Sequence, residues 1–192
     1  MKLRTSSPRR RLGLAAVPLA MLASAGLVYQ ASQAAFTAST STDTNNWTAG
    51  SVALTNSSSG SALFNISGLG GGATDTKCVT VTYNGDLTAG VKLYATSVSG
   101  TGLDQYLDLT IEEGTGGNAA CVGFTPVRTL HTGTLKSFTD AATSFNTGLT
   151  PAWAVTGAGQ TNVYRFTWTL QNNNSAMGKN AHAAFTWEAQ NS

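Results

Sequence analysis

The chain has 192 residues and a formal net charge of +2, but its charges are unevenly distributed. Five of the eleven lysine and arginine residues fall in the first 34 positions, which hold none of the nine acidic residues, so the remainder carries six cations against nine anions. A weakly acidic domain with scattered cations lacks the basic surface with which proteins bind nucleic acid.

The first 34 residues have the sequence pattern of a secretory signal. A basic stretch from Lys2 to Arg11 is followed by an apolar, uncharged stretch over residues 12–28, and then by small residues at positions 32 and 34. A basic, an apolar and a small-x-small region in this order are typical of a signal peptide that is removed during export. We therefore predict that residues 1–34 are a signal peptide and that the protein is secreted, to the extracellular space or the cell surface.

Cleavage is predicted between Ala34 and Ala35, with cleavage after Ala31 or after Ala35 as alternatives. A signal peptidase is then a partner during export, and no membrane segment is expected in the exported protein. A retained membrane anchor is the competing interpretation, because the apolar stretch is about long enough to span a bilayer.

Residues 35–192 have a length that suits one domain. They are rich in Thr, Ser, Asn, Gly and Ala and poor in charge, which favours strands and turns over helices. We expect a flexible N-terminal segment over 35–50 and a folded domain over 51–192. The first four residues of that segment suit a short strand: Ala35, Phe36, Thr37 and Ala38.

Residues 161–170 show the clearest strand pattern. Large apolar side chains alternate there with polar ones, which is the period of a strand with one buried and one solvated face. Similar segments bounded by turn residues predict further strands at 51–55, 62–67, 76–84, 91–98, 106–113, 127–135, 152–155 and 183–188. The core is expected around five aromatic residues: Tyr164, Phe166, Trp168, Phe185 and Trp187.

One helix is predicted, over residues 136–146. Apolar residues at spacings of three and four, from Phe138 to Phe145, would form one buried stripe there. Parallel strands would need long helices between them, which the sequence lacks. We therefore predict an all-β fold, an antiparallel two-sheet sandwich that is jelly-roll-like and has one short helix.

Cys78 and Cys121 are the two cysteines of the chain. An even number of cysteines in an oxidising compartment favours a disulfide. Closing a loop of this length would contribute roughly 3–4 kcal/mol on the chain-entropy model. Two free thiols are the alternative, whereas two sulfurs without nearby histidines do not complete a zinc site.

The sequence shows no catalytic motif. Its two histidines, His131 and His182, have neither the context of a nucleophilic triad nor that of a zinc-binding helix. Asp108 and Glu112 share the polar face of one predicted strand, and we interpret these two as a solvated face, or as a weak calcium contact, rather than a glycosidase pair. We expect no catalytic residues, no metal site and no cofactor.

Strand edges are the remaining feature with functional potential, because an open sandwich must protect its edges or use them. If signal cleavage releases Ala35 to Ala38, this segment would be free to add as a strand to a neighbour's sheet. Head-to-tail repetition of that step would produce a filament. Pairing within its own domain, or disorder, is the alternative.

Four features follow one another along the chain: the end of the signal at 34–39, the segment from Trp47 to Leu54, the strand pattern at 106–112, and the aromatic segments 164–168 and 185–189. Together they resemble the TasA/camelysin family of secreted bacterial matrix and cell-surface proteins, in its actinobacterial type. The resemblance implies a jelly-roll sandwich, removal of the signal by a dedicated signal peptidase, and display in a biofilm matrix or on the cell surface.

Members of that family build fibres by donating an N-terminal strand to the next subunit, and Ala35 to Ser39 lie where that strand would be. We therefore expect a fibre subunit or adhesin that self-associates by strand exchange. A metallo-endopeptidase of the camelysin kind, using His131 and His182, is an alternative, although no zinc motif supports it. A carbohydrate-binding module with contacts at Trp47 and Trp153 is another.

Overall fold

The structure is a computed structural model that describes residues 37–41, 53–58, 63 and 69–191. These residues belong to one compact unit, Phe36–Ser192. The predicted signal peptide, the cleavage site at Ala34 and Ala35, and Phe36 of the predicted donor segment lie outside the described residues. In the part of the chain that is described, no helix is long and apolar enough to cross a membrane.

The described residues form nine β-strands, one α-helix and two short 3-10 helices. The strands are β1 (Thr37–Ser41), β2 (Leu54–Asn56), β3 (Thr74–Tyr83), β4 (Ala89–Gly100), β5 (Leu107–Thr115), β6 (Thr125–Thr134), β7 (Trp153–Val155), β8 (Gln160–Leu170) and β9 (Ala181–Asn191). The helices are α2 (Leu135–Ala141), η1 (Leu103–Gln105) and η2 (Asn174–Ala176).

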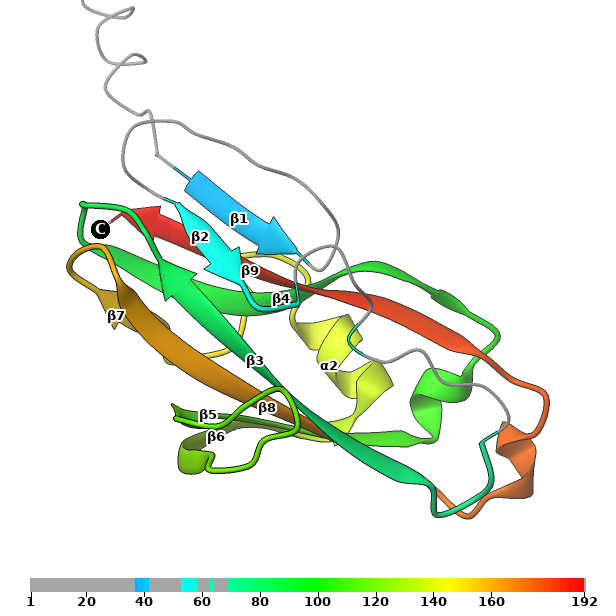
Figure 1. Cartoon of the computed structure of the whole chain (residues 1–192). Coiled ribbons are helices and arrows are strands. Elements are labelled where there is room, and N and C mark those ends of the chain that lie inside the picture. Colours follow the sequence, from blue (N-terminus) through cyan, green and yellow to red (C-terminus); the bar gives the residue numbers. More distant parts are fainter. Residues whose placement is uncertain (1–36, 42–52, 59–62, 64–68, 192) are drawn as a thin grey trace, which may run out of the picture. The chain divides into compact units, whose positions relative to one another are not determined.

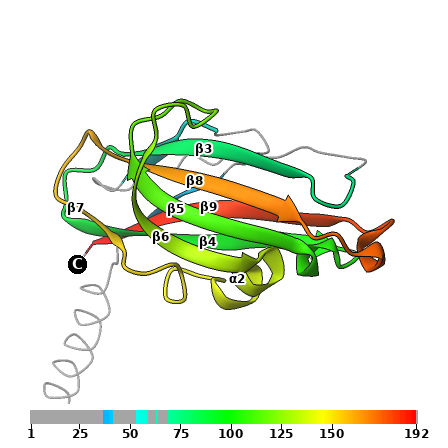
Figure 2. The same cartoon turned by 90° about the horizontal axis from the view of Figure 1, so that it is seen from below.

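The strands form two antiparallel sheets, which Figure 1 and Figure 2 show as two layers. One sheet has the order β1-β9-β4-β7 and the other the order β2-β3-β8-β5-β6. Strands that are distant in sequence are therefore neighbours, such as β3 with β8 and β4 with β9. This crossed connection of two sheets is that of a jelly roll. The predicted antiparallel two-sheet sandwich with one short helix is confirmed.

The two sheets meet through large aromatic side chains. The ring centroids of Phe166 on β8 and Phe185 on β9 lie 4.6 Å apart, and those of Tyr164 and Trp187 lie 5.4 Å apart. Trp168, on the same face of β8, is also buried. Tilted ring pairs of this kind add to the stabilisation from burial itself. All five aromatic residues that the sequence placed in the core are buried.

Residue alternation decides which face of each strand is buried. In β3, Val79, Val81 and Tyr83 are fully buried, whereas Thr80 and Thr82 between them are half-buried on the outer face. β8 has the same alternating burial. Because a slip of one residue would exchange the two faces, this pattern strongly favours the observed pairing of β3 with β8.

The predicted helix is shorter in the structure than over residues 136–146, because α2 ends at Ala141. Beyond it, the hydroxyl oxygen of Thr147 accepts hydrogen bonds from the backbone N–H groups of Thr143 and Ser144, at 3.0 and 3.1 Å. Side-chain bonds of this kind compete with the backbone bonds of a helix. The apolar spacing was therefore a poor guide to the end of the helix.

The folded domain begins earlier than the predicted position 51. β1 lies within the segment 35–50 that was predicted to be flexible, and it belongs to the same compact unit. It pairs with β9, at the other end of the sequence, and such a contact leaves no local sequence pattern. The strand predicted over 62–67 lies outside the described residues except for Leu63, which packs against the core.

Cys78 and Cys121 form the predicted disulfide. It ties the loop between β5 and β6 to β3, where the backbone N–H of Cys78 also donates to the carbonyl of Ala119 at 3.1 Å. The guanidinium of Arg165 on β8 lies 4.6 Å from the ring centroid of Phe124, a distance at which cation–π attraction is effective. The disulfide therefore fastens this loop over the outer face of the sheet.

Candidate functional site

β1 is the outermost strand of its sheet, and within the described residues it pairs with β9 alone. The pairing is antiparallel over five residues, from Thr37 opposite Gln190 to Ser41 opposite Thr186. Figure 1 shows β1 at this edge, beside β9 and close to β2 of the other sheet, which it contacts. Thr37 and Ala38 of the predicted donor segment are thus the first two residues of an edge strand, the kind of element through which sheets associate.

Polar contacts hold β9, the strand that pairs with β1, in place. The Tyr94 hydroxyl donates to one carboxylate oxygen of Glu188 at 2.7 Å, and the amide of Gln190 donates to the other at 2.8 Å. The hydroxyl oxygens of Thr96 and Thr186 lie 2.9 Å apart. Burial raises the pKa of Tyr94 and the bond to Glu188 raises it further, so the phenol stays protonated as a donor. β9 therefore offers a rigid edge to the strand that pairs with it.

The two histidines lie in different sheets. His131 is on β6, with its ring 5.5 Å from that of Phe138, and His182 is exposed near the start of β9. Burial lowers the pKa of His131, which a hydrogen bond with the backbone of Thr134 opposes in part. Across residues 37–41, 53–58, 63 and 69–191, no three histidine, cysteine or acidic side chains could hold a metal ion together. The described residues therefore do not unite His131 and His182 in a zinc site.

Asp108 and Glu112 lie on the outer face of β5, and separate neighbours engage them. Asp108 accepts a hydrogen bond from the amide of Gln171 at 2.7 Å, and Glu112 accepts one from Nε of Arg165 at 2.7 Å. Asp108 is exposed, but the side chain of Glu112 is only 17% exposed, so the predicted solvated face is wrong for Glu112. A glycosidase needs two carboxylates that face one scissile bond, and these two are held by different partners instead.

Glu113 lies on the same face of β5 as Leu109 and Ile111, and it is 5% exposed and buried in the sandwich. Arg128 on β6 donates to one of its carboxylate oxygens through Nε at 2.8 Å and through a terminal guanidinium nitrogen, while the amide of Asn162 donates to the other oxygen at 3.3 Å. Tyr164 lies opposite Glu113 in the strand pair, and burial, together with that negative charge, raises its pKa. These contacts offset the loss of water around a buried carboxylate.

Arg128→Ala is expected to lower the free energy of unfolding by about 2 kcal/mol. It leaves the buried carboxylate of Glu113 with the Asn162 amide alone. The side chain of Arg128 is 46% exposed, so its guanidinium can recover water when Glu113 is neutralised. Glu113→Gln should therefore cost less, about 1 kcal/mol. Urea denaturation of both variants measures the order of the two losses, and a larger loss for Glu113→Gln would contradict this account.

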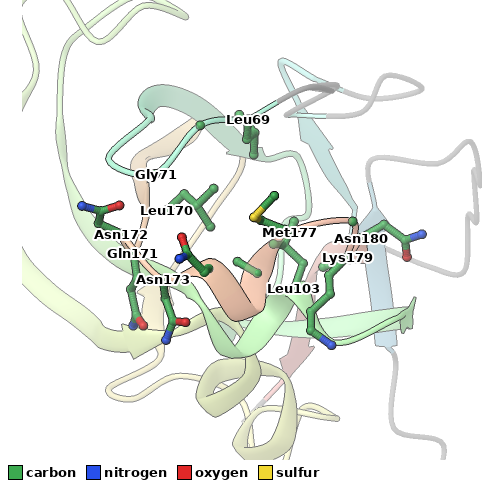
Figure 3. Close-up of a pocket in the computed structure, with 15 residues that line it drawn as sticks. Leu69, Gly71, Leu103, Leu170, Gln171, Asn172, Asn173, Met177, Lys179 and Asn180 are labelled. Atoms are coloured by element: carbon green, nitrogen blue, oxygen red, sulfur yellow. The ribbon is translucent and has the colours of Figure 1, made fainter.

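A pocket of about 640 Å³, which we call the loop-end pocket, lies at the end of the sandwich where β8 ends and β9 begins (Figure 3). Its walls come from the turn before β3, from η1 and from the loop 171–180. Backbone hydrogen bonds fasten these parts together, from the N–H of Gly72 to the carbonyl of Leu170 at 2.8 Å and from Gln171 to Tyr106 at 2.9 Å. The local sequence signal for this loop is a polar stretch with a run of three asparagines.

The tryptophans considered for carbohydrate binding do not form an exposed aromatic surface among the described residues. Trp47 lies outside them, and Trp153 on β7 is half-buried against the core. A ring in that position stabilises the fold and has little free face for a sugar. Trp153 therefore does not supply a flat exposed platform of that kind.

Comparison with known proteins leaves the site to be interpreted from its own geometry. No family model matches the chain, and no curated protein matches it. The resemblance to the TasA/camelysin family therefore rests on the sequence segments that carry it.

Proposed function

We propose that this is a secreted structural protein of an extracellular matrix or cell surface, a fibre subunit or adhesin resembling the TasA/camelysin family, and that it self-associates by exchange of β1. The observation that carries the proposal is the place of β1, a five-residue edge strand at the N-terminal end of the compact unit that pairs with β9. Neither a catalytic centre nor a cofactor nor nucleic acid has a part in this function.

Strand exchange would preserve the backbone pairing that β1 makes within its own chain. The β1 of a second copy would meet the same β9 partners, from Gln190 to Thr186, so each hydrogen bond is replaced by an equivalent one. The chain from Ser41 to Leu54 can span up to about 40 Å when extended, enough to reach an adjacent molecule. Because every subunit donates one strand and accepts one, head-to-tail repetition gives an open filament.

Two further observations support an extracellular role. The disulfide between Cys78 and Cys121 belongs to a class that persists in oxidising compartments. The first 34 residues carry the pattern of a secretory signal. We propose that a signal peptidase cleaves between Ala34 and Ala35, which frees the segment leading into β1 and leaves no membrane segment in the product.

Protein exported from the full-length chain is expected to form filaments, and a variant lacking residues 35–46 is expected to stay monomeric. The deletion removes β1, so each molecule keeps a β9 edge that can accept a strand but has no strand to donate. Electron microscopy and gel filtration measure the outcome, and circular dichroism shows whether the deletion variant remains folded. A synthetic peptide of residues 35–46 should bind that variant. The same assembly state in both proteins would contradict strand exchange.

A cysteine pair separates strand exchange from other kinds of association. Ala38 and Ala189 are directly opposite each other in the β1–β9 pair, and Cα atoms at such positions lie about 4.5–5.5 Å apart, within reach of a disulfide. If the variant with Ala38→Cys and Ala189→Cys is oxidised after filaments have formed, it should give covalently linked chains. If it is oxidised before filaments form, it should give monomers in which the disulfide locks β1 onto its own β9. Thr110→Cys with Thr167→Cys, opposite each other in β5 and β8, is the matched control and should react within one molecule in both cases.

A further inference from the structure

We propose that the loop-end pocket binds a segment of a neutral, hydroxyl-rich chain, namely a glycan. The pocket is built from the ends of β8 and β9 and from η1, and none of the residues that carry the argument belongs to β1. The inference therefore stands whether or not β1 is exchanged between subunits.

The charge of the pocket favours an uncharged ligand. Among the described lining residues, Lys179 is the only charged one, and its ammonium already donates to the carbonyl of Thr101 at 3.3 Å. The one cation that an anionic ligand could contact is the Lys179 ammonium, which is already hydrogen-bonded. These residues include no carboxylate that could pair with a cationic ligand. Because burying an unpaired charge is costly, the pocket selects for neutral ligands.

Two amide side chains of the pocket are available to a ligand. The side-chain amides of Asn172 and Asn174 make no hydrogen bond with any other described group, whereas that of Asn173 between them accepts one from the N–H of Ser175 at 2.9 Å and so anchors the loop. An amide offers two donors and an acceptor, and a sugar hydroxyl is itself donor and acceptor. One asparagine can therefore bond to two neighbouring hydroxyls of one ring, while Asn173 holds the loop in place.

The pocket also has an apolar side. Met177 is 78% exposed, and Figure 3 shows it between Leu69 and Leu103, with Asn172 and Asn173 to one side. A pyranose ring carries C–H groups on its faces and hydroxyls at its rim, so its face can rest on Met177 while its rim meets the amides. The thioether chain adapts to irregular apolar surfaces. The pocket volume also lies within the range of small-ligand sites, about 300–1,000 Å³.

An extended peptide fits the pocket less well. Peptides that add to a strand use free backbone N–H and C=O groups. The backbone that borders the pocket is already paired, with the N–H of Leu170 on the carbonyl of Ala73 at 2.8 Å and the N–H of Gln171 on the carbonyl of Tyr106 at 2.9 Å. A glycan, which is bound through side chains, is therefore the favoured ligand.

Affinity electrophoresis of the exported protein tests the proposal, in gels that contain dextran, hydroxyethylcellulose, mannan, xylan or galactan. We expect at least one of these neutral polysaccharides to retard the protein. Asn172→Ala combined with Asn174→Ala, and separately Met177→Ala, should weaken that binding by about tenfold or more. Asn146→Ala and Val122→Ala change exposed residues outside the pocket and should leave the binding unchanged.

Retardation by none of the five polysaccharides would overturn the proposal, as would binding that survives both pocket variants. Binding of an uncharged Ser/Thr/Asn hexapeptide without binding of any polysaccharide would assign the pocket to peptides and overturn it equally. Filaments are scored on the same preparations. Normal filaments in the pocket variants, and glycan binding by the variant lacking residues 35–46, would show that the pocket and β1 act separately.

Discussion

Trp187→Ala is expected to lower the free energy of unfolding by about 4 kcal/mol. Trp187 is fully buried on β9 and meets the rings of Tyr164 and Phe166 across the sandwich, with centroids 5.4 and 6.0 Å away. Alanine removes the indole from the contact between the sheets and leaves a cavity. Two hydrogen-bonded sheets cannot close around that cavity without moving as units, so the lost burial and the cavity both reduce stability.

Urea denaturation followed by circular dichroism measures this loss. Trp187→Phe keeps an aromatic ring in the cavity and should cost less, about 2 kcal/mol. Val122→Ala, at a side chain that is 72% exposed, is the control and should change stability by no more than about 0.5 kcal/mol. If Trp187→Ala cost no more than Val122→Ala, the core could not be organised around this ring.

Removal of the disulfide by Cys78→Ser with Cys121→Ser is expected to cost about 3–4 kcal/mol of stability. The bond joins residues 43 positions apart, so its loss lets the unfolded chain explore many more conformations. In the folded variant, two weaker contacts would still hold the loop between β5 and β6. They are the backbone hydrogen bond to the carbonyl of Ala119 and the stacking of Arg165 on Phe124.

Urea denaturation with and without dithiothreitol provides the measurement for the disulfide. The reductant should lower the stability of the unchanged protein to that of the double serine variant, and it should have no effect on the variant. A protein whose midpoint does not respond to the reductant would show that the two weaker contacts, rather than the disulfide, hold the loop.

Sequence periodicity placed the long strands well because the two faces of a strand differ in exposure to water. The predicted ranges 76–84 and 161–170 correspond to β3 and β8 with ends that differ by no more than two residues. The same approach failed at the end of α2, where hydroxyl groups rather than apolar spacing determined the backbone. Glu113 continues the inward alternation of Leu109 and Ile111, and an acidic residue at such a core position is tolerated only when a partner such as Arg128 reaches it.

Residue type and spacing were sufficient for the class of fold, the aromatic core and the cysteine pair, since these follow from side-chain chemistry along short stretches. The folded arrangement was needed to place β1 beside β9, and to bring Asn172, Met177 and Leu103 to one pocket. Contacts between segments so far apart arise from many small interactions summed over the whole sandwich. Each segment can look the same in a sequence whichever neighbour it finally meets, which is why its partners emerge only from the complete packing.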